Sequence, residues 1–261
     1  MTQHTPDLTE ETRDGVLWLT FNRPEARNAL TFAMYERLAA ICSDMPTDGS
    51  VRAVVLSGAG GKAFAAGTDM TQFRAFEVAQ DALDYEHQID AVLEAVERCP
   101  VPTIAAIHGA CTGGGASIAA ACDIRIASAR LKFGFPIART LGNCLAAGNL
   151  ARLSDLMGAG RVREMIFTAR LIEADEAQRV GLITEVLEDE DALMTRATEL
   201  ADLVGSMAPL TLRATKEAMR RTRASVAVDD SDLITSCYMS ADFRTGMEAF
   251  LAKRKPEWTG T

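Results

Sequence analysis

The chain has 261 residues, of which 48% are hydrophobic, and it carries 36 Asp and Glu against 27 Lys and Arg. This length and composition predict one large globular domain, or one domain with an appendage, and exclude extensive disorder. The formal net charge of −9 argues against a general nucleic-acid or anionic-membrane binder, although a few local cations can still hold a small anionic ligand.

Strands and helices alternate in the first two thirds of the chain. Thr31 is a suitable N-cap for a first helix, and apolar side chains at helical spacing predict a long helix from about 82 to 98. A further helix of small residues follows a run of three glycines, over 116–121. Short apolar runs predict strands at 15–21, 51–56, 103–107 and 123–127.

Helices dominate after residue 140. Helical patterns cover about 145–157, 160–168, 173–179 and 190–206, with a short strand near 183–187. The last 55 or so residues show three more helical patterns and no strand. The sequence therefore predicts an α/β fold, with a core over 1–206 and a C-terminal helical region over 207–261.

The six cysteines form no CxxC pair and there are only three histidines, so we expect no metal site. No apolar run approaches the roughly 18 residues that a membrane span needs. The polar N-terminal segment has neither the apolar centre of an export signal nor an Arg-rich amphipathic pattern. We expect a cytoplasmic protein that binds neither nucleic acid nor membrane.

Two glycine-containing turns can expose backbone amides, at 65–69 (AAGTD) and 113–115 (GGG). The first N–H groups of a helix have no internal partner, and glycine leaves no side chain to block a ligand oxygen. Two such amides that converge form an oxyanion hole, whereas the alternative is that the glycines only allow tight packing. Neither turn has the spacing of a phosphate-binding loop, which disfavours a nucleotide-cofactor enzyme.

Five blocks, in order along nearly the whole chain, resemble the crotonase (enoyl-CoA hydratase/isomerase) superfamily. They are 22–30 (NRPEARNAL), 62–70 (KAFAAGTDM), 107–115 (IHGACTGGG), 121–127 (ACDIRIA) and 247–255 (MEAFLAKRK). The resemblance implies a spiral of ββα turns and a C-terminal helical region that builds trimers and often hexamers. It also implies a coenzyme A thioester as substrate and no tightly bound cofactor.

The resemblance further implies roles for single residues. The amides of Thr68 and Gly114 would receive the thioester oxygen and stabilise an enolate in a dry pocket. Phe250 and Lys253, on the last helix of a neighbouring subunit, would approach the nucleotide end of coenzyme A. The coenzyme A-binding positions are Glu25, Ala26, Arg27, Lys62, Ala65, Ala66, Gly67, Asp69, Phe250 and Lys253. Asp69 has a structural alternative, as the carboxylate at a helix terminus.

The chain departs from the family where hydratases place two glutamates on either side of a water. The first position is Ser117, two residues after the glycine triplet, and the second is Ile137, or Ala138 if one extra residue falls earlier. No acid follows 141–142 either, where other branches carry one. A serine hydroxyl holds a water but does not deprotonate it at neutral pH, so the sequence argues against ordinary two-glutamate hydration.

Two polar residues on the same segment could replace the missing acids. Arg139 either pairs with a carboxylate on the acyl chain or forms a structural ion pair. Asn143 either orients water or the acyl group, or caps the following helix. Two functions stay open: an acyl-CoA enzyme for isomerisation, hydration by an unusual base, or C–C or thioester cleavage, and a thioester-binding protein without proton-transfer chemistry.

Overall fold

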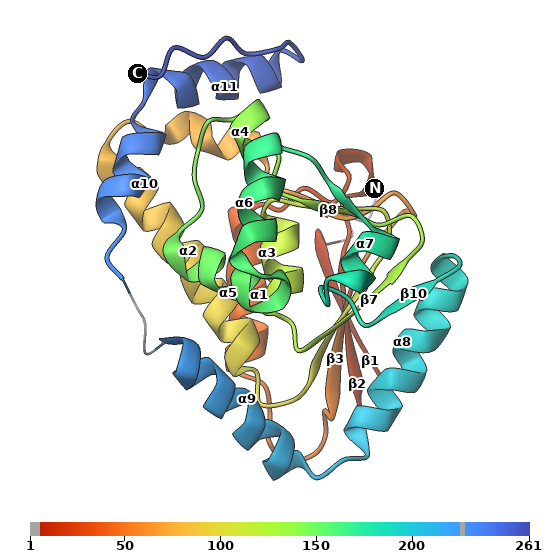
Figure 1. Ribbon diagram of the computed structural model, residues 1–261. Helices are drawn as coiled ribbons and strands as arrows, with labels where there is room; N and C mark the ends of the chain where they lie inside the picture. The colour runs from red at the N-terminus through yellow and green to blue at the C-terminus, as the bar shows by residue number, and fades with distance from the viewer. Residues whose placement is uncertain (1–5, 225–227) are drawn as a thin grey trace, which may run out of the picture.

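The strands form a six-stranded and a four-stranded sheet within residues 6–224 and 228–261, which the computed structural model describes (Figure 1). In the larger sheet β1 is antiparallel to β2, and all the other neighbours are parallel. Its strands, in spatial order, are β1 (Leu8–Arg13), β2 (Val16–Phe21), β3 (Ala53–Gly58), β5 (Thr103–Ile107), β7 (Ile124–Ser128) and β10 (Glu185–Leu187).

The smaller sheet has the order β4 (Ala63–Ala66), β6 (Ala110–Thr112), β8 (Lys132–Gly134) and β9 (Ile172–Glu173). In this sheet, β4, β6 and β8 are the strands that come directly after β3, β5 and β7 of the larger sheet in the chain. The chain thus passes from the larger sheet to the smaller and then into a helix three times, through β3–β4, β5–β6 and β7–β8. The helices are α2 (Ala79–Arg98), α3 (Gly114–Ala121) and α4 (Ile137–Thr140), and the 3-10 helix η2 (Met70–Ala75) precedes α2. This is the expected ββα spiral.

The step between β5 and β6 requires a glycine. Gly109 has φ +70°, and a Cβ there would lie 2.2 Å from the carbonyl oxygen of Lys62. An L side chain would both clash with that carbonyl and be strained in the left-handed region. The glycine therefore lets the chain turn sharply from one sheet into the other.

Helices cover both faces of the larger sheet, which explains why its strands are nearly continuous apolar runs. On one face, Trp18 and Val55 pack against Leu193 of α8 (Glu190–Gly205). On the other face, Leu19 and Leu56 pack against α1 (Phe32–Ser43), α2 and α3. Figure 1 shows α8 and α1–α3 on opposite sides of the strands.

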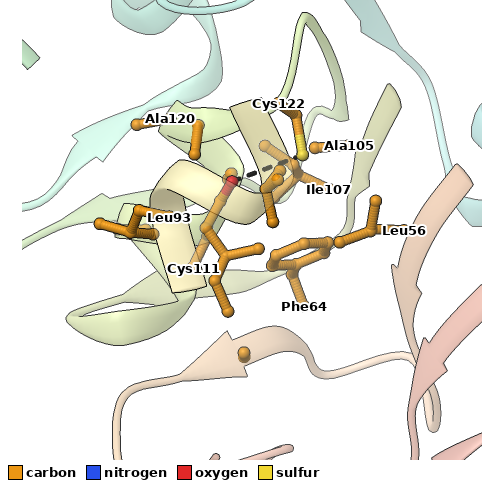
Figure 2. Packing of buried hydrophobic residues seen from close by; sticks show 14 of the residues in the cluster. Leu56, Phe64, Leu93, Ala105, Ile107, Cys111, Ala120 and Cys122 are labelled. Carbon is orange, nitrogen blue, oxygen red and sulfur yellow. Dashed lines mark hydrogen bonds between the residues drawn. The ribbon is translucent and has the colours of Figure 1, made fainter. Parts of the chain in front are cut away.

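Small side chains allow α3 to approach the sheets closely. Figure 2 shows Ala105, Ala120, Cys111 and Cys122 packed among larger apolar side chains such as Phe64. Burial raises the pKa of the Cys111 thiol well above its ordinary value and that of Cys122 to about 12. These cysteines are therefore small protonated core residues.

Most predicted elements are confirmed within one to three residues, including Thr31 as the N-cap of α1, where its hydroxyl accepts from the Met34 amide at 3.3 Å. The later helices are α5 (Ala147–Met157), α6 (Ala159–Thr168), α7 (Ala174–Arg179) and α8. Sequence analysis missed β1, which has a single buried residue, and all strands of the smaller sheet, which are two to four residues long. Such short strands carry too few residues for a periodic pattern.

The three predicted C-terminal helices are α9 (Pro209–Ala224), α10 (Ser231–Tyr238) and α11 (Ala241–Leu251). α10 packs on α2, and α11 packs on α4 and η2, whereas α9 lies at the far end of the molecule and buries none of its residues (Figure 1). α8 ends at Gly205 and α9 begins at Pro209, but a domain boundary near 206 stays a prediction. None of the helices in the described ranges is both long and apolar enough to cross a membrane.

Candidate active site

A cavity of about 170 Å³ lies between the start of α3, the middle of α2, the loop after α4, and α10. Most of its wall is apolar, and its polar side chains are hydroxyls, amides and one carboxyl group. The lining residues that carry polar side chains are Thr68, Tyr85, Glu86, Thr112, Ser117, Thr140, Asn143, Asn149 and Tyr238.

Two backbone amides in this wall are free. The backbone amide of Asp69 donates to the carbonyl oxygen of Leu30, and the amide of Leu30 donates to the carbonyl oxygen of Gly67, both at 2.8 Å. In the described part of the chain, no acceptor takes a hydrogen bond from the amide of Thr68 between them, or from that of Gly114, the first residue of α3. A Cβ on Gly114 would lie 3.2 Å from the Thr68 hydroxyl oxygen, so the two residues are in contact. The predicted pair of amides therefore lies together in one wall.

Two tyrosines hold this wall in place. The hydroxyls of Tyr35, on α1, and Tyr85, on α2, lie 2.9 and 3.0 Å from the Thr68 hydroxyl oxygen. A Cβ on Gly114 would lie 1.8 Å from the Tyr35 hydroxyl oxygen, so only glycine fits there. Burial raises the pKa of both tyrosines, which keeps the hydroxyls neutral.

Ser117 and Ile137, the positions where the family resemblance led us to expect glutamates, both line the cavity. Ser117 is buried; its hydroxyl donates to the Gly113 carbonyl at 3.3 Å and accepts from the Asn149 side-chain amide at 2.7 Å. Ile137 is buried as well. Neither side chain ionises near neutral pH, so at these positions the cavity lacks an acid–base group.

A carboxyl group that sequence analysis missed is part of the same wall. Glu86, on α2, is only 6% exposed, and its Oε1 accepts a hydrogen bond from the Tyr238 hydroxyl at 2.5 Å. The pKa of Glu86 is raised to about 7. Burial is the main cause and the nearby Asp90 and Asp230 add to it, whereas the hydrogen bonds from Tyr238 and the Ala146 backbone act in the opposite direction.

One signal in the sequence could have indicated Glu86. The predicted helix over 82–98 has an apolar stripe that includes Ile89 and Leu93, and Glu86 stands three and seven residues before them. Residues at these spacings share a helix face, so Glu86 is an acid on the buried face. Nothing in the sequence pairs it with Tyr238, which is 152 residues away.

The structure separates the two polar candidates, Arg139 in α4 and Asn143 in the loop after it. Asn143 lines the cavity and its side-chain amide donates to the Tyr238 hydroxyl at 3.1 Å. Asn143 does not cap α5, whose N-cap residue is Ala146, so the capping alternative is wrong. Arg139 is exposed, lies outside the cavity wall, and forms no ion pair with any described residue. A structural ion pair of Arg139 is therefore not observed.

Of the residues expected to bind coenzyme A, only Ala66, Gly67 and Phe250 line the cavity among the described residues. Ala66 and Gly67 line it, and the Ala66 amide donates to the Arg27 carbonyl at 3.1 Å, which joins the first two sequence blocks. Glu25, Arg27 and Lys62 are exposed, Ala26 is half-buried, and Ala65 is buried. Asp69 caps η2 and pairs with Arg23 at 3.0 Å, which is its structural alternative.

The last helix reaches the cavity of its own chain. Phe250, at the end of α11, is one of the lining residues, although the resemblance had assigned it to a neighbouring subunit. The packing of α11 on α4 and η2 places it there (Figure 1). Lys253 is exposed just beyond α11 and does not line the cavity. Across the described ranges, no three His, Cys, Asp or Glu side chains are grouped so that they could hold a metal ion.

The fold and the cavity define an α/β protein of the ββα-spiral type with two free amides beside a buried carboxyl group. The model of the enoyl-CoA hydratase/isomerase family matches residues 11–261, and the chain belongs to that family, within the crotonase superfamily. It is 36% identical over 251 residues to the short-chain-enoyl-CoA hydratase of Clostridium acetobutylicum, which covers 95% of both chains.

Two solved structures share the fold over almost the full length. An enoyl-CoA hydratase/carnithine racemase from Magnetospirillum magneticum aligns with a TM-score of 0.79 at 34% identity, over 99% of this chain and 97% of that one. A methylmalonyl-CoA decarboxylase in complex with 2-nitronate-propionyl-CoA aligns with a TM-score of 0.89 at 26% identity, over 99% and 100%. The backbone is thus closer to the decarboxylase, although the sequence is closer to the hydratase/racemase.

Proposed function

We propose that the chain is an enzyme that binds a coenzyme A thioester and stabilises its enolate with the backbone amides of Thr68 and Gly114. The observation that carries this proposal is that two neighbouring residues with unpaired backbone N–H groups line a mostly apolar cavity. The Gly114 amide stands at the start of α3, where the helix dipole also favours a negative charge. Preorganised donors of this kind stabilise a developing oxyanion strongly because little water competes for them.

The size of the cavity sets what it can hold. At about 170 Å³ it is smaller than the roughly 300–1,000 Å³ typical of pockets for larger ligands, so it suits a short acyl group rather than a whole coenzyme A. The rest of the coenzyme would lie outside, along Glu25, Ala26, Lys62 and 65–67, where the exposed cations Arg27 and Lys62 face its phosphates. Self-association into a trimer or hexamer, and a cytoplasmic location, belong to the same proposal.

The chemistry that this site favours is proton transfer next to the thioester. Ser117 and Ile137 argue against a two-glutamate hydration, because neither side chain can activate water. A thioester-binding protein without chemistry is the alternative function. The buried carboxyl group of Glu86 favours an enzyme, since a protein that only binds has no need of an acid in an apolar wall.

Calorimetry with matched ligands tests the role of the two amides. Butyryl-CoA should bind about tenfold or more tightly than the butyl thioether of coenzyme A, which lacks the carbonyl oxygen and so loses two hydrogen bonds. 2-Nitronate-propionyl-CoA, whose negative charge imitates an enolate, should bind more tightly still than propionyl-CoA.

Two alanine variants make this test specific to the site. Gly114→Ala should abolish the preference for the thioester, because the new Cβ collides with Tyr35 and displaces the amide. Gly160→Ala is the matched control, since a Cβ there meets nothing within 4 Å. Equal affinities of wild type for thioester and thioether would contradict the proposed oxyanion hole.

A further inference from the structure

We propose that Glu86 is the catalytic residue that moves the proton on the carbon next to the thioester, and that Tyr238 positions it. This inference rests on the proposed function and names the acid–base group that the sequence left unassigned. Its basis is the placement of one buried carboxyl group and one buried hydroxyl in the wall that carries the free amides.

Glu86 is the only acid among the described residues that line the cavity, and that lining contains no Lys, Arg, His or Cys. The hydroxyls of Tyr85 and Tyr238 do not compete as bases, because burial raises the pKa of both well above the ordinary value. Proton transfer near neutral pH therefore falls to Glu86.

The carboxyl group is connected to the free amides through the tyrosines. Tyr85, next to Glu86 on α2, has its hydroxyl 3.0 Å from that of Thr68. The ring of Tyr85 lies 6.2 Å from that of Tyr238, centroid to centroid, and the Tyr238 hydroxyl donates to Glu86. The two free amides and the Glu86 carboxyl group thus line the same small cavity, and neighbouring side chains connect them.

Two residues from two other segments orient the carboxyl group. Asn143, in the loop after α4, donates to the Tyr238 hydroxyl, and Tyr238, on α10, donates to Glu86. The Asn143 side-chain oxygen is buried and has no hydrogen-bond partner among the described residues, so it remains available to a polar group in the cavity. Asn143 therefore holds the Tyr238 hydroxyl so that its hydrogen is directed at Glu86. Tyr238 acts through Glu86 and is a positioning residue.

The step needs no co-reactant. The C–H bond next to the thioester carbonyl breaks, the proton passes to the Glu86 carboxylate, and the electron pair moves onto the thioester oxygen as an enolate. The amides of Thr68 and Gly114 hold that oxygen. The carboxylic acid then returns the proton to carbon, which restores the carboxylate and collapses the enolate.

The surroundings of Glu86 give the step a defined pH dependence. Glu86 forms no ion pair in the described part of the chain. The titratable groups that interact with it are Tyr35, Tyr85, Asp90, Cys144, Asp230 and Tyr238. Because the carboxylate is the base, proton removal by the wild type should rise with pH through a midpoint near 7.

The experiment follows exchange of the α-protons of butyryl-CoA in D₂O by NMR from pH 5 to 9, with binding of the same ligand measured by calorimetry. Wild type should exchange. Glu86→Gln, which keeps the size of the side chain, should bind the thioester but exchange about 100-fold or more slowly, without the midpoint near 7. Asp84→Asn, exposed on the same helix, is the matched control and should exchange like wild type.

Tyr238→Phe separates positioning from mere support of the fold. Loss of the Tyr238 hydrogen bond, which lowers the pKa of Glu86, should move the midpoint to higher pH while thioester binding persists. Exchange by Glu86→Gln at the wild-type rate overturns this inference and leaves the proposed function standing. Binding without any exchange by wild type overturns the enolate step, and failure to bind any thioester overturns the proposed function itself.

Discussion

Glu86 and Glu97 stand on the same helix in opposite electrostatic environments. Glu97 accepts two hydrogen bonds from Arg152, at 2.7 and 3.0 Å, and also pairs with Arg223. Glu86 is more deeply buried and has only a neutral hydroxyl as its side-chain partner. Burying a carboxylate without a cation beside it is unfavourable, so the ionised form of Glu86 destabilises the folded state.

The pH dependence of stability follows from this environment. The pKa of Glu86 rises from 4.5 to about 7 on folding, so between these values the folded state binds more protons than the unfolded state. Protonation of Glu86 stabilises the folded state. This contribution is fully present below pH 4.5 and is lost as the pH rises through 7, which lowers the free energy of unfolding by about 3 kcal/mol. Glu86→Gln should match wild type near pH 4.5 and be more stable by up to that amount at pH 8.

Urea denaturation of both proteins at pH 4.5, 6 and 8 measures this difference. Asp84→Asn serves as the control for removing a charge from the same helix, and its difference from wild type should stay constant. A Glu86→Gln protein that loses stability relative to wild type at pH 8 would show that the carboxylate is structurally required.

The helices α2, α5 and α9 meet at a small ion cluster. Glu97 of α2 bridges Arg152 of α5 and Arg223 of α9, and the side chains of Arg152 and Glu97 are only 7% and 11% exposed. The cluster therefore couples α9, which buries no residue of its own, to α2 and α5, which both line the cavity.

Glu97→Gln should lower the free energy of unfolding by about 3 kcal/mol, because it leaves the buried guanidinium of Arg152 without a charged partner. Chemical denaturation at neutral pH measures the effect. Glu217→Gln is the control on α9: the Glu217 side chain is 35% exposed and its partner Arg220 keeps an ion pair with Glu94, so the stability should hardly change. Similar losses in both variants would show that burial does not distinguish the two clusters.

The molecule as a whole leaves apolar surface uncovered at the end that carries α9. Leu210 and Met219 on this helix are 73% and 70% exposed. A helix with apolar side chains and no buried residue gains little from its own chain, so other copies of the chain are the natural cover. This agrees with the self-association that the family resemblance implies.

Sedimentation equilibrium at micromolar concentration should show a trimer or a multiple of it. Replacing both exposed side chains, Leu210→Glu with Met219→Glu, should shift the assembly towards smaller species, because charges at an apolar interface are costly to bury. A wild-type chain that sediments as a monomer would contradict the proposed assembly.

The sequence by itself determined the features that depend on neighbours along the chain. The alternation of strands and helices, the Thr31 cap, the glycine triplet and the absence of an acid at Ser117 and Ile137 can all be recognised locally. Periodic burial and capping act over three or four residues, so a linear pattern records them. The two glycine-containing turns at 65–69 and 113–115 were also visible locally, whereas the pairing of the Thr68 and Gly114 amides was implied only by the family resemblance.

Only the tertiary structure decided which distant residues meet. The smaller sheet is made of strands of two to four residues, which exist because each pairs with a neighbour and not because of their own pattern. Glu86 meets Tyr238 across 152 residues because α10 packs on α2, and α11 brings Phe250 to the cavity of its own chain. Contacts of this kind arise from the packing of whole elements, whose relative positions no local pattern specifies, and they place the carboxyl group of Glu86 in the cavity wall.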